Sequence, residues 1–399
     1  MYNTEHSTTK RPLRQRDLPL NRASKCLRGI SSPQLAFWDL SAERTSPTMA
    51  RIEPDDPALP IRQKLTRTTF SQEWRPYNLA QTNEKQRFEQ LLYDLCSGIN
   101  EPEQTFGRPR VLLADIVFSA TLKAYTMVSG RRNTGAIKEA YDKGYVSKVL
   151  HYNTISKYLE RERLTEILTN LIEESAIPLK TVELHFAPDS TGFSTGIYRR
   201  WSEVKWGAIA TNYANKEPSA RVRNKEFVKL HIATGVKTNI VTAAKVTKGF
   251  ASDCKEFEYL IERTNRNFSI RSVFADKAYS SYRNVNLVVM KGGTPYIPFK
   301  TNARAHNRSP ESWKRMFHLY NYQQAEFMRQ YHQRSNVETT MSMIKKKFGD
   351  RLRGKVFTAQ ANELLCKVLC HNICCVIQSI YELGIEASFW QESNGQEES

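Results

Sequence analysis

The order of strand and helix patterns between residues 181 and 348 constrains the fold more than any other feature of the chain. Three strand patterns come first, at 181–187, 226–234 and 239–246, and a glycine marks a hairpin turn between the last two. Helix and strand patterns then alternate, at 254–265, 270–275, 281–290, 294–299 and 312–348. This order predicts a mixed α/β sheet flanked by helices, with three antiparallel strands followed by parallel ones.

Two aspartates follow strand patterns. Asp189 comes after the apolar run VELHFAP, and Asp276 comes after SVFA. Because α/β sheets gather their sites at the carboxyl ends of strands, we expect both side chains at one edge. They converge if the first and fourth strands are neighbours. Taken alone, each aspartate is equally well explained as a turn or cap residue, and Asp253 is a rival acid whose place before a helix favours an N-cap role.

A third acid lies in a patterned segment further along the chain. This segment follows the pattern Tyr-x2-Arg-x3-Glu-x6-Lys, and the residues that match the pattern are Tyr331, Arg334, Glu338 and Lys345. If 331–348 is one helix, these side chains occupy a stripe about 60° wide. An apolar stripe lies beside it and comprises Val337, Met341, Ile344 and Phe348. On spacing alone, an ordinary i,i+4 ion pair on an exposed helix is the favoured explanation of the arginine and glutamate.

These motifs together resemble those of bacterial insertion-sequence transposases of the DDE class. Asp189-Ser-Thr-Gly-Phe is similar to the first-acid motif, and Asp276-Lys-Ala-Tyr is similar to the second. The Tyr-Arg-Glu-Lys set looks like the signature around the last acid, and the resemblance spans residues 74–383. It implies a ribonuclease H-like catalytic core in which Asp189, Asp276 and Glu338 are the catalytic residues and metal ligands. It also implies that Tyr331, Arg334 and Lys345 contact the DNA of the transposon ends.

The expected cofactor follows from the chemistry of three carboxylates. Acids held together repel one another and require a cation, and oxygen-only ligands favour Mg²⁺ or Mn²⁺. Two ions about 3.5–4 Å apart would serve an in-line phosphoryl displacement. Because Glu338 follows Asp276 by only 62 positions, there is no room for the large β-rich insertion of some relatives, which leaves hairpin and non-hairpin cleavage as open alternatives.

The charge balance predicts a polyanionic partner. The 399 residues carry 59 Lys and Arg against 41 Asp and Glu, a formal net charge of +18, so we expect double-stranded DNA, both element ends and target. Positive charge is concentrated in 198–237, which includes Arg199 and Arg200, and in 300–355, which includes the run Lys345-Lys346-Lys347. We expect these segments to follow the phosphate backbone, and a solvated charged surface is the alternative.

The chain divides into four expected regions. Residues 1–60 lack periodicity and predict a disordered basic arm, and 384–399 form an acidic tail. Residues 61–180 contain several short helix patterns with Arg131 and Arg132 at a turn, which suits an all-helical DNA-end-binding domain; a plain helical support domain is nearly as good an interpretation. Residues 181–383 form the catalytic domain.

Cysteine usage and hydropathy favour the cytoplasm. The seven cysteines include no Cys-x-x-Cys pair, and four of them lie in an apolar helical run, which predicts buried packing and not a metal site. No run approaches 18 apolar residues, so we expect no membrane span. A prokaryotic, nucleoid-associated location and a homodimer in the DNA complex are expected by analogy.

The sequence thus predicts a DNA transposase that cleaves strands at transposon ends with metal ions and transfers the 3′-hydroxyl to target DNA. Two alternatives remain, a catalytically silent transposase-derived DNA-binding regulator and a ribonuclease H-like nuclease without strand transfer.

Overall fold

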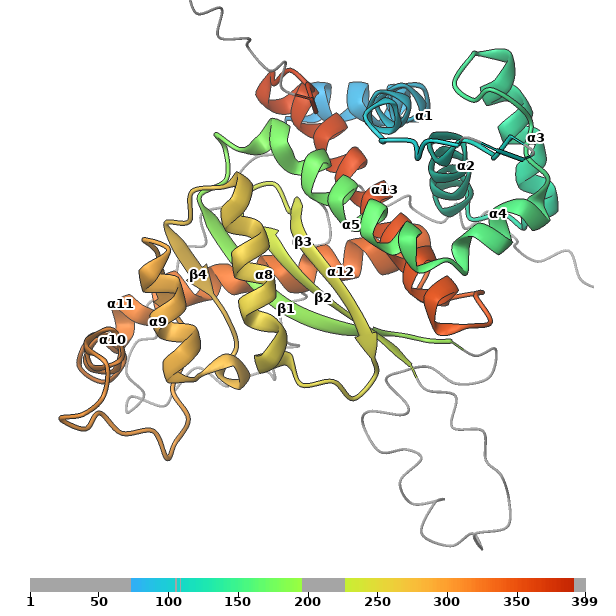
Figure 1. Ribbon diagram of the computed structural model, residues 1–399. Helices are drawn as coiled ribbons and strands as arrows, with labels where there is room; N and C mark the ends of the chain where they lie inside the picture. Colours follow the sequence, from blue (N-terminus) through green and yellow to red (C-terminus); the bar gives the residue numbers. More distant parts are fainter. Residues whose placement is uncertain (1–72, 105, 108, 196–226, 391–399) are drawn as a thin grey trace, which may run out of the picture. The chain divides into compact units, whose positions relative to one another are not determined.

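The computed structural model describes residues 73–104, 106–107, 109–195 and 227–390 (Figure 1). By contacts the chain divides into two units, Met1–Thr45 and Ser46–Ser399, and every described residue belongs to the second. The expected basic arm, and residues 391–399 of the expected tail, lie outside the described residues.

A five-stranded mixed sheet has the strand order β3-β2-β1-β4-β5. The strands are β1 (His185–Phe193), β2 (Val228–Gly235), β3 (Val241–Lys248), β4 (Ser272–Phe274) and β5 (Thr294–Tyr296). β1 pairs antiparallel with β2, and β2 with β3, whereas β4 lies parallel to β1 and β5 parallel to β4. The expected order of three antiparallel strands and then parallel ones is confirmed, and it is consistent with an α/β nuclease-like fold.

Helices cover both faces of the sheet, as a largely buried mixed sheet requires. Figure 1 shows α8 (Asp253–Asn267) in front of the sheet and α12 (Ser335–Phe348) behind it. α9 (Tyr282–Met290) packs against α8 and β5. The remaining elements of this part are η3 (Lys277–Tyr279), α10 (Glu311–Tyr322), α11 (Gln324–Tyr331) and η4 (His332–Arg334).

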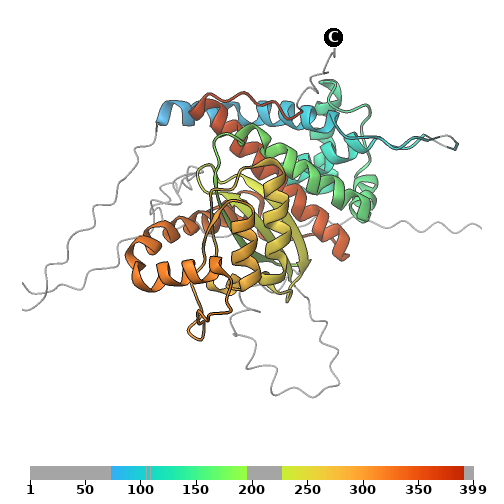
Figure 2. The ribbon, with the colours of Figure 1, turned by 60° about the vertical axis from the view of Figure 1, so that its left-hand side comes forward.

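The helical region before the sheet packs around the last helix, α13 (Phe357–Leu383). Its elements are α1 (Trp74–Ser97), α2 (Leu113–Thr126), α3 (Gly130–Asp142), α4 (Tyr152–Leu159), α5 (Glu162–Ala176) and η2 (Ile177–Leu179). Figure 2 shows α13 running beside α1 and α5, and α13 also contacts β3. The helical region and the sheet therefore share one core helix.

α13 is the one described helix that is long and apolar enough to cross a membrane. However, 89% of its most apolar stretch is buried inside the protein. Cys366, Cys370, Cys374 and Cys375 lie buried within it, in the packing role expected from their apolar surroundings. Among the described residues, this helix is the centre of the hydrophobic core.

One expected helix boundary in the helical region is wrong. The sequence predicts a turn at Arg131 and Arg132, but Ser129 is the N-cap of α3, and its hydroxyl accepts a hydrogen bond from the backbone N–H of Arg132. The N-cap of α4 is His151, whose Nδ1 accepts from the backbone N–H of Asn153 at 3.3 Å.

The segment expected as one helix over 331–348 is divided into three pieces. Tyr331 ends α11, Arg334 ends the 3₁₀ turn η4, and Glu338 lies in the first turn of α12. A short 3₁₀ turn is common where helices join, and the backbone angles remain right-handed through it. The apolar stripe of Val337, Met341, Ile344 and Phe348 is buried, as expected.

An ion pair ties α12 to the helical region. Lys347 Nζ lies 2.5 Å from Glu84 Oε2 of α1, and the hydroxyl of Tyr125 donates to Glu84 Oε1 at 2.9 Å. Both charged side chains are largely covered, at 24% and 14% exposed. Lys347 therefore belongs to the packing between α12 and α1, although the sequence grouped it with the expected DNA-facing run.

We expect Lys347→Ala to lower the free energy of unfolding by about 3 kcal/mol, because it leaves Glu84 covered and without its cation. Urea denaturation measures the change. Lys346→Ala is the matched control, since Lys346 is exposed on the next position of the same helix, and its effect should stay within ~0.5 kcal/mol. Equal stabilities of the two variants would contradict the assignment.

Candidate functional site

Asp189 lies inside β1, not after it. Its Cα pairs with that of Ile232, and the strand continues to Phe193 because pairing with β2 continues that far. The expectation that the strand ends before Asp189 is therefore wrong. The carboxyl side chain is only 18% exposed, so it projects from a fixed and largely covered backbone position.

Asp276 follows the end of β4, as expected, and is the N-cap of η3. Its Oδ1 accepts a hydrogen bond of 2.7 Å from the backbone N–H of Lys277. The parallel register pairs Phe186 of β1 with Val273 of β4. Continuing that register by three residues brings Asp276 level with Asp189 on neighbouring strands, which meets the condition that the sequence set for their convergence.

Arg334 connects the first acid to the third. One guanidinium nitrogen donates to Asp189 Oδ2 and the other to Glu338 Oε1, both at 2.9 Å. The Arg334 side chain is 17% exposed, so water screens these bonds less than at an open surface. Asp189 of the sheet thus adds a third member to the i,i+4 ion pair of Arg334 and Glu338, so this pair is not an isolated surface ion pair.

The electrostatics link all three acids. The pKa of Asp189 is raised to about 6, chiefly by burial, and the charges of Asp276 and Glu338 act in the same direction. Arg334 and the backbone N–H of Ser190 act in the opposite direction but do not outweigh burial. The carboxylates are therefore close enough to repel one another. The guanidinium of Arg334 does not fully offset this repulsion and the burial of Asp189, because the pKa of Asp189 remains raised.

Tyr331 belongs to the same cluster. Burial raises its pKa, and its hydroxyl is influenced by the charges of Arg334, Asp276, Asp189 and Glu338. Lys345, further along α12, donates from Nζ to Thr191 Oγ1 at 2.6 Å. Thr191 lies two residues beyond Asp189 in β1, so α12 runs along β1 with its cation directed at the strand.

The opposite face of β1 carries a second polar network. Asp253 Oδ1 accepts from the Ser190 hydroxyl at 2.6 Å and lies 2.6 Å from Lys229 Nζ. His231 Nδ1 lies 3.4 Å from the same oxygen, and burial lowers the pKa of this histidine to about 4. The expectation that Asp253 is an N-cap is wrong, because Ser252 occupies that position and Asp253 faces the sheet. This network therefore holds β1 from the face that α8 covers.

Tyr279 was missed as a site residue, although it is the last residue of the Asp276-Lys-Ala-Tyr motif. It is 1% exposed, and its hydroxyl has no hydrogen-bond partner among the described residues. Burial raises its pKa, with further contributions from Asp189, Asp253 and Asp276. Its hydroxyl therefore lies within electrostatic reach of acids from both polar networks, and its ring packs against Phe257 of α8. The sequence signal that could have identified it is a tyrosine three positions after an aspartate that follows a strand pattern.

Three of the remaining expected DNA contacts lie on described helices. Arg131 and Arg132 are exposed on α3, and the guanidinium of Arg131 lies 5.2 Å from the ring centroid of Tyr152. Lys346 is exposed on α12. Arg199 and Arg200 fall outside the described residues.

Asp189, Asp276 and Glu338 offer only carboxylate oxygens, and their charge and atom type suit a hard divalent cation. The positions of these side chains, however, do not form a metal site. In the part of the chain that the structure describes, no three His, Cys, Asp or Glu side chains are arranged to hold a metal ion. Arg334 lies between Asp189 and Glu338 and supplies the positive charge there.

The comparisons agree with these motifs. Residues 180–373 match the family model described as "Transposase DDE domain", a range that includes all three acids and Arg334. No curated protein and no solved structure matches the chain. The match supports a DDE-type transposase.

The raised pKa of Asp189 has a measurable effect on stability. A carboxyl group with a raised folded-state pKa stabilises the protein below its unfolded value of 3.8, and that contribution is lost as pH rises through about 6. We expect Asp189→Asn to gain about 1–2 kcal/mol relative to the wild type between pH 5 and pH 8 in EDTA. Urea titrations at both pH values measure this difference, and a difference that does not vary with pH would refute the prediction.

The position of Arg334 predicts competition with metal. Arg334→Gln frees two carboxylates, so we expect Mn²⁺ to bind the DNA-free protein about tenfold more tightly, the equivalent of one charge-assisted hydrogen bond. Electron paramagnetic resonance of free Mn²⁺ measures the affinity without relying on activity.

Arg329→Gln is the matched control for this measurement. It removes an exposed guanidinium, paired only with Glu326, from the neighbouring helix α11. Unchanged Mn²⁺ affinity in Arg334→Gln, or an equal gain in Arg329→Gln, would show that Arg334 does not compete for the acids.

Proposed function

We propose that the chain is a DNA transposase that cleaves strands at the ends of a mobile element and joins the resulting 3′-hydroxyl to target DNA. Asp189, Asp276 and Glu338 are the proposed catalytic residues and the ligands of two Mg²⁺ or Mn²⁺ ions. The observation that carries the proposal is the contact of Arg334 with Asp189 and Glu338, beside Asp276 at the end of β4. This arrangement brings together acids from three distant segments.

The proposed chemistry is an in-line displacement at phosphorus. When bound, the ions activate the attacking oxygen, first of water and then of the 3′-hydroxyl, and stabilise the leaving oxygen. The protein's own contribution is to hold its carboxylates in place. Asp189 is fixed by the pairing of β1 with β2, and Glu338 by the buried stripe of α12. Rigid elements of this kind position a site better than loops do.

Arg334 has a second part in this mechanism. A guanidinium that binds two carboxylates in the DNA-free protein also matches the paired oxygens of a phosphodiester. We propose that Arg334 releases Asp189 or Glu338 and binds the DNA backbone when an element end enters. Tyr331, Lys345 and Lys346 would contact the same DNA, and Arg199 and Arg200 would extend the contact.

The helical region of residues 61–180, with Arg131 and Arg132 on α3, is the proposed DNA-end-binding domain, and residues 181–383 the catalytic one. A homodimer that joins two ends, a bacterial insertion-sequence origin and action on chromosomal DNA in the cytoplasm complete the proposal. These parts of the proposal rest on the resemblance to transposases and on the DNA substrate that the transposase domain implies.

Strand cleavage tests the enzymatic part. With Mg²⁺ and DNA that contains an element end, we expect Asp276→Ala to lose at least about 100-fold in cleavage rate, since even partners of metal ligands cost 10–100-fold. Glu262→Gln removes an exposed acid on α8 and should cleave like the wild type.

Absence of cleavage in every variant would favour the catalytically silent regulator over the enzyme. Pre-cut ends with a free 3′-hydroxyl test the second step. Their joining to target DNA by the wild type is the expected result, and cleavage without joining would favour the plain nuclease.

A further inference from the structure

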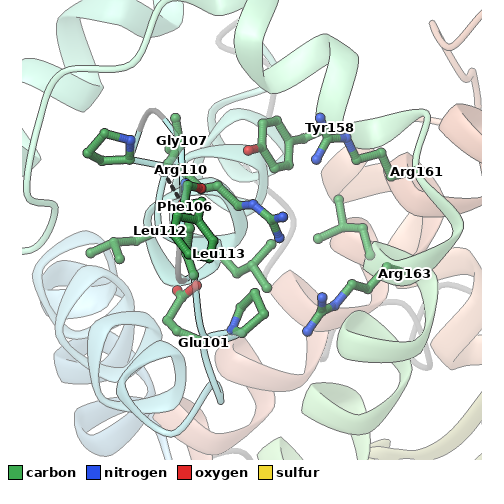
Figure 3. A pocket seen from close by; sticks show the side chains of 14 residues that line it. Glu101, Phe106, Gly107, Arg110, Leu112, Leu113, Tyr158, Arg161 and Arg163 are labelled. Atoms are coloured by element: carbon green, nitrogen blue, oxygen red, sulfur yellow. Dashed lines mark hydrogen bonds between the residues drawn. The ribbon is translucent and has the colours of Figure 1, made fainter.

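A cavity of about 380 Å³ lies in the helical region, outside the acid cluster (Figure 3). One wall is the segment of residues 101–113 that leads into α2, and the other is the junction of α4 and α5. Leu113 and Leu164 are buried lining residues that form an apolar base. The two walls thus come from segments about 50 positions apart, which tertiary packing brings together.

Three arginines surround this cavity. Arg110 comes from the first wall, and Arg161 and Arg163 come from the second. In Figure 3 the guanidinium groups of Arg110 and Arg163 point toward the space between the walls. Arg161 lies with its guanidinium carbon 4.0 Å from the ring centroid of Tyr158, which also lines the cavity. Stacking of this kind holds a guanidinium in a fixed plane.

The positive charge of the cavity is not balanced by neighbouring acids. Within the described residues, none of the three arginines forms an ion pair with a carboxylate. Glu101 is the one acid that lines the cavity, and its Oε1 accepts a hydrogen bond of 2.9 Å from the backbone N–H of Ala114 at the start of α2. The cavity therefore has an excess of two positive charges and favours an anion.

The shape and chemistry favour a segment of nucleic-acid backbone. Planar guanidinium groups bind phosphate oxygens in pairs, and three of them can hold two adjacent phosphates. Phe106 is 91% exposed at the rim, and together with Tyr158 it offers aromatic surface to a sugar or a base. The apolar base of the cavity suits the same ligand, because a deoxyribose has no charge.

A second basic cavity lies between the end of α12 and the α4–α5 junction. Its volume is about 1060 Å³, and it is lined by α2, the 348–357 segment and the start of α13. Its charged lining residues are Lys123, Arg351, Arg353, Lys355 and Lys367 against Asp350 and Glu363. It begins at Phe348, ten residues or about 15 Å of helix beyond Glu338, and it reaches Leu159 at the α4–α5 junction.

We propose that the cavity of Arg110, Arg161 and Arg163 is a non-catalytic binding site for DNA backbone phosphates, several base pairs from the cleaved bond. The inference rests on the proposed function, since it assumes a DNA substrate. A duplex that leaves the acids along α12 passes the second cavity and meets the three arginines at the α4–α5 junction. The site adds affinity and fixes the direction of the duplex, and it takes no part in the chemistry.

The test is the salt dependence of DNA binding by the full chain in EDTA, measured by fluorescence anisotropy with an end-containing duplex. Arg110→Ala/Arg163→Ala removes two exposed cations and leaves the fold intact. Because each lost phosphate contact lowers the slope of log affinity against log salt by about 0.9, we expect a slope smaller by about 1.8 and an affinity lower by about tenfold.

The matched control is Lys255→Ala/Arg266→Ala, which removes two exposed cations from α8 on the other side of the sheet and should leave the slope unchanged. A wild type that binds and cleaves DNA, together with an unchanged slope in the Arg110/Arg163 variant or an equal change in the control, overturns this site alone. A wild type that binds no DNA overturns the proposed function and this site with it.

Discussion

Arg334 is the point at which the sheet and the helix behind it become one site. Its two hydrogen bonds of 2.9 Å join Asp189 of β1 to Glu338 of α12. Without a cation at this place, burial and mutual repulsion would act on the carboxylates unopposed, as the raised pKa of Asp189 indicates. The DNA-free protein therefore stabilises its acid cluster internally, and the same guanidinium remains suited to a phosphate.

Two further contacts hold that arrangement in place. On the face of β1 that α8 covers, the Asp253 network fixes Ser190, the residue next to the first acid. At the far end of α12, Lys347 and Glu84 attach the helix to α1, and α13 packs against both the sheet and the helical region. The second basic cavity begins at Phe348, the last residue of α12.

Much of the fold was predictable because its signals are local. The succession of three antiparallel strands and then parallel ones followed from the order of strand and helix patterns, and the buried stripe of α12 from period 3.6. The predictions that were wrong concerned residues whose positions depend on tertiary contacts. Asp189 lies inside its strand because β2 pairs beyond it, and Asp253 faces the sheet because Lys229 and Ser190 bind it there. The contact from Arg334 to Asp189 was likewise invisible, since only the fold brings those residues together.

The most direct test of the account is a crystal structure of the protein with Mn²⁺ and a processed DNA end, with the ions located by anomalous scattering. The account predicts two anomalous peaks coordinated by Asp189, Asp276 and Glu338, with Arg334 turned from the carboxylates to a backbone phosphate. Peaks that lack one of the three acids as ligand, or an Arg334 still bound to both Asp189 and Glu338 beside the DNA, would contradict it.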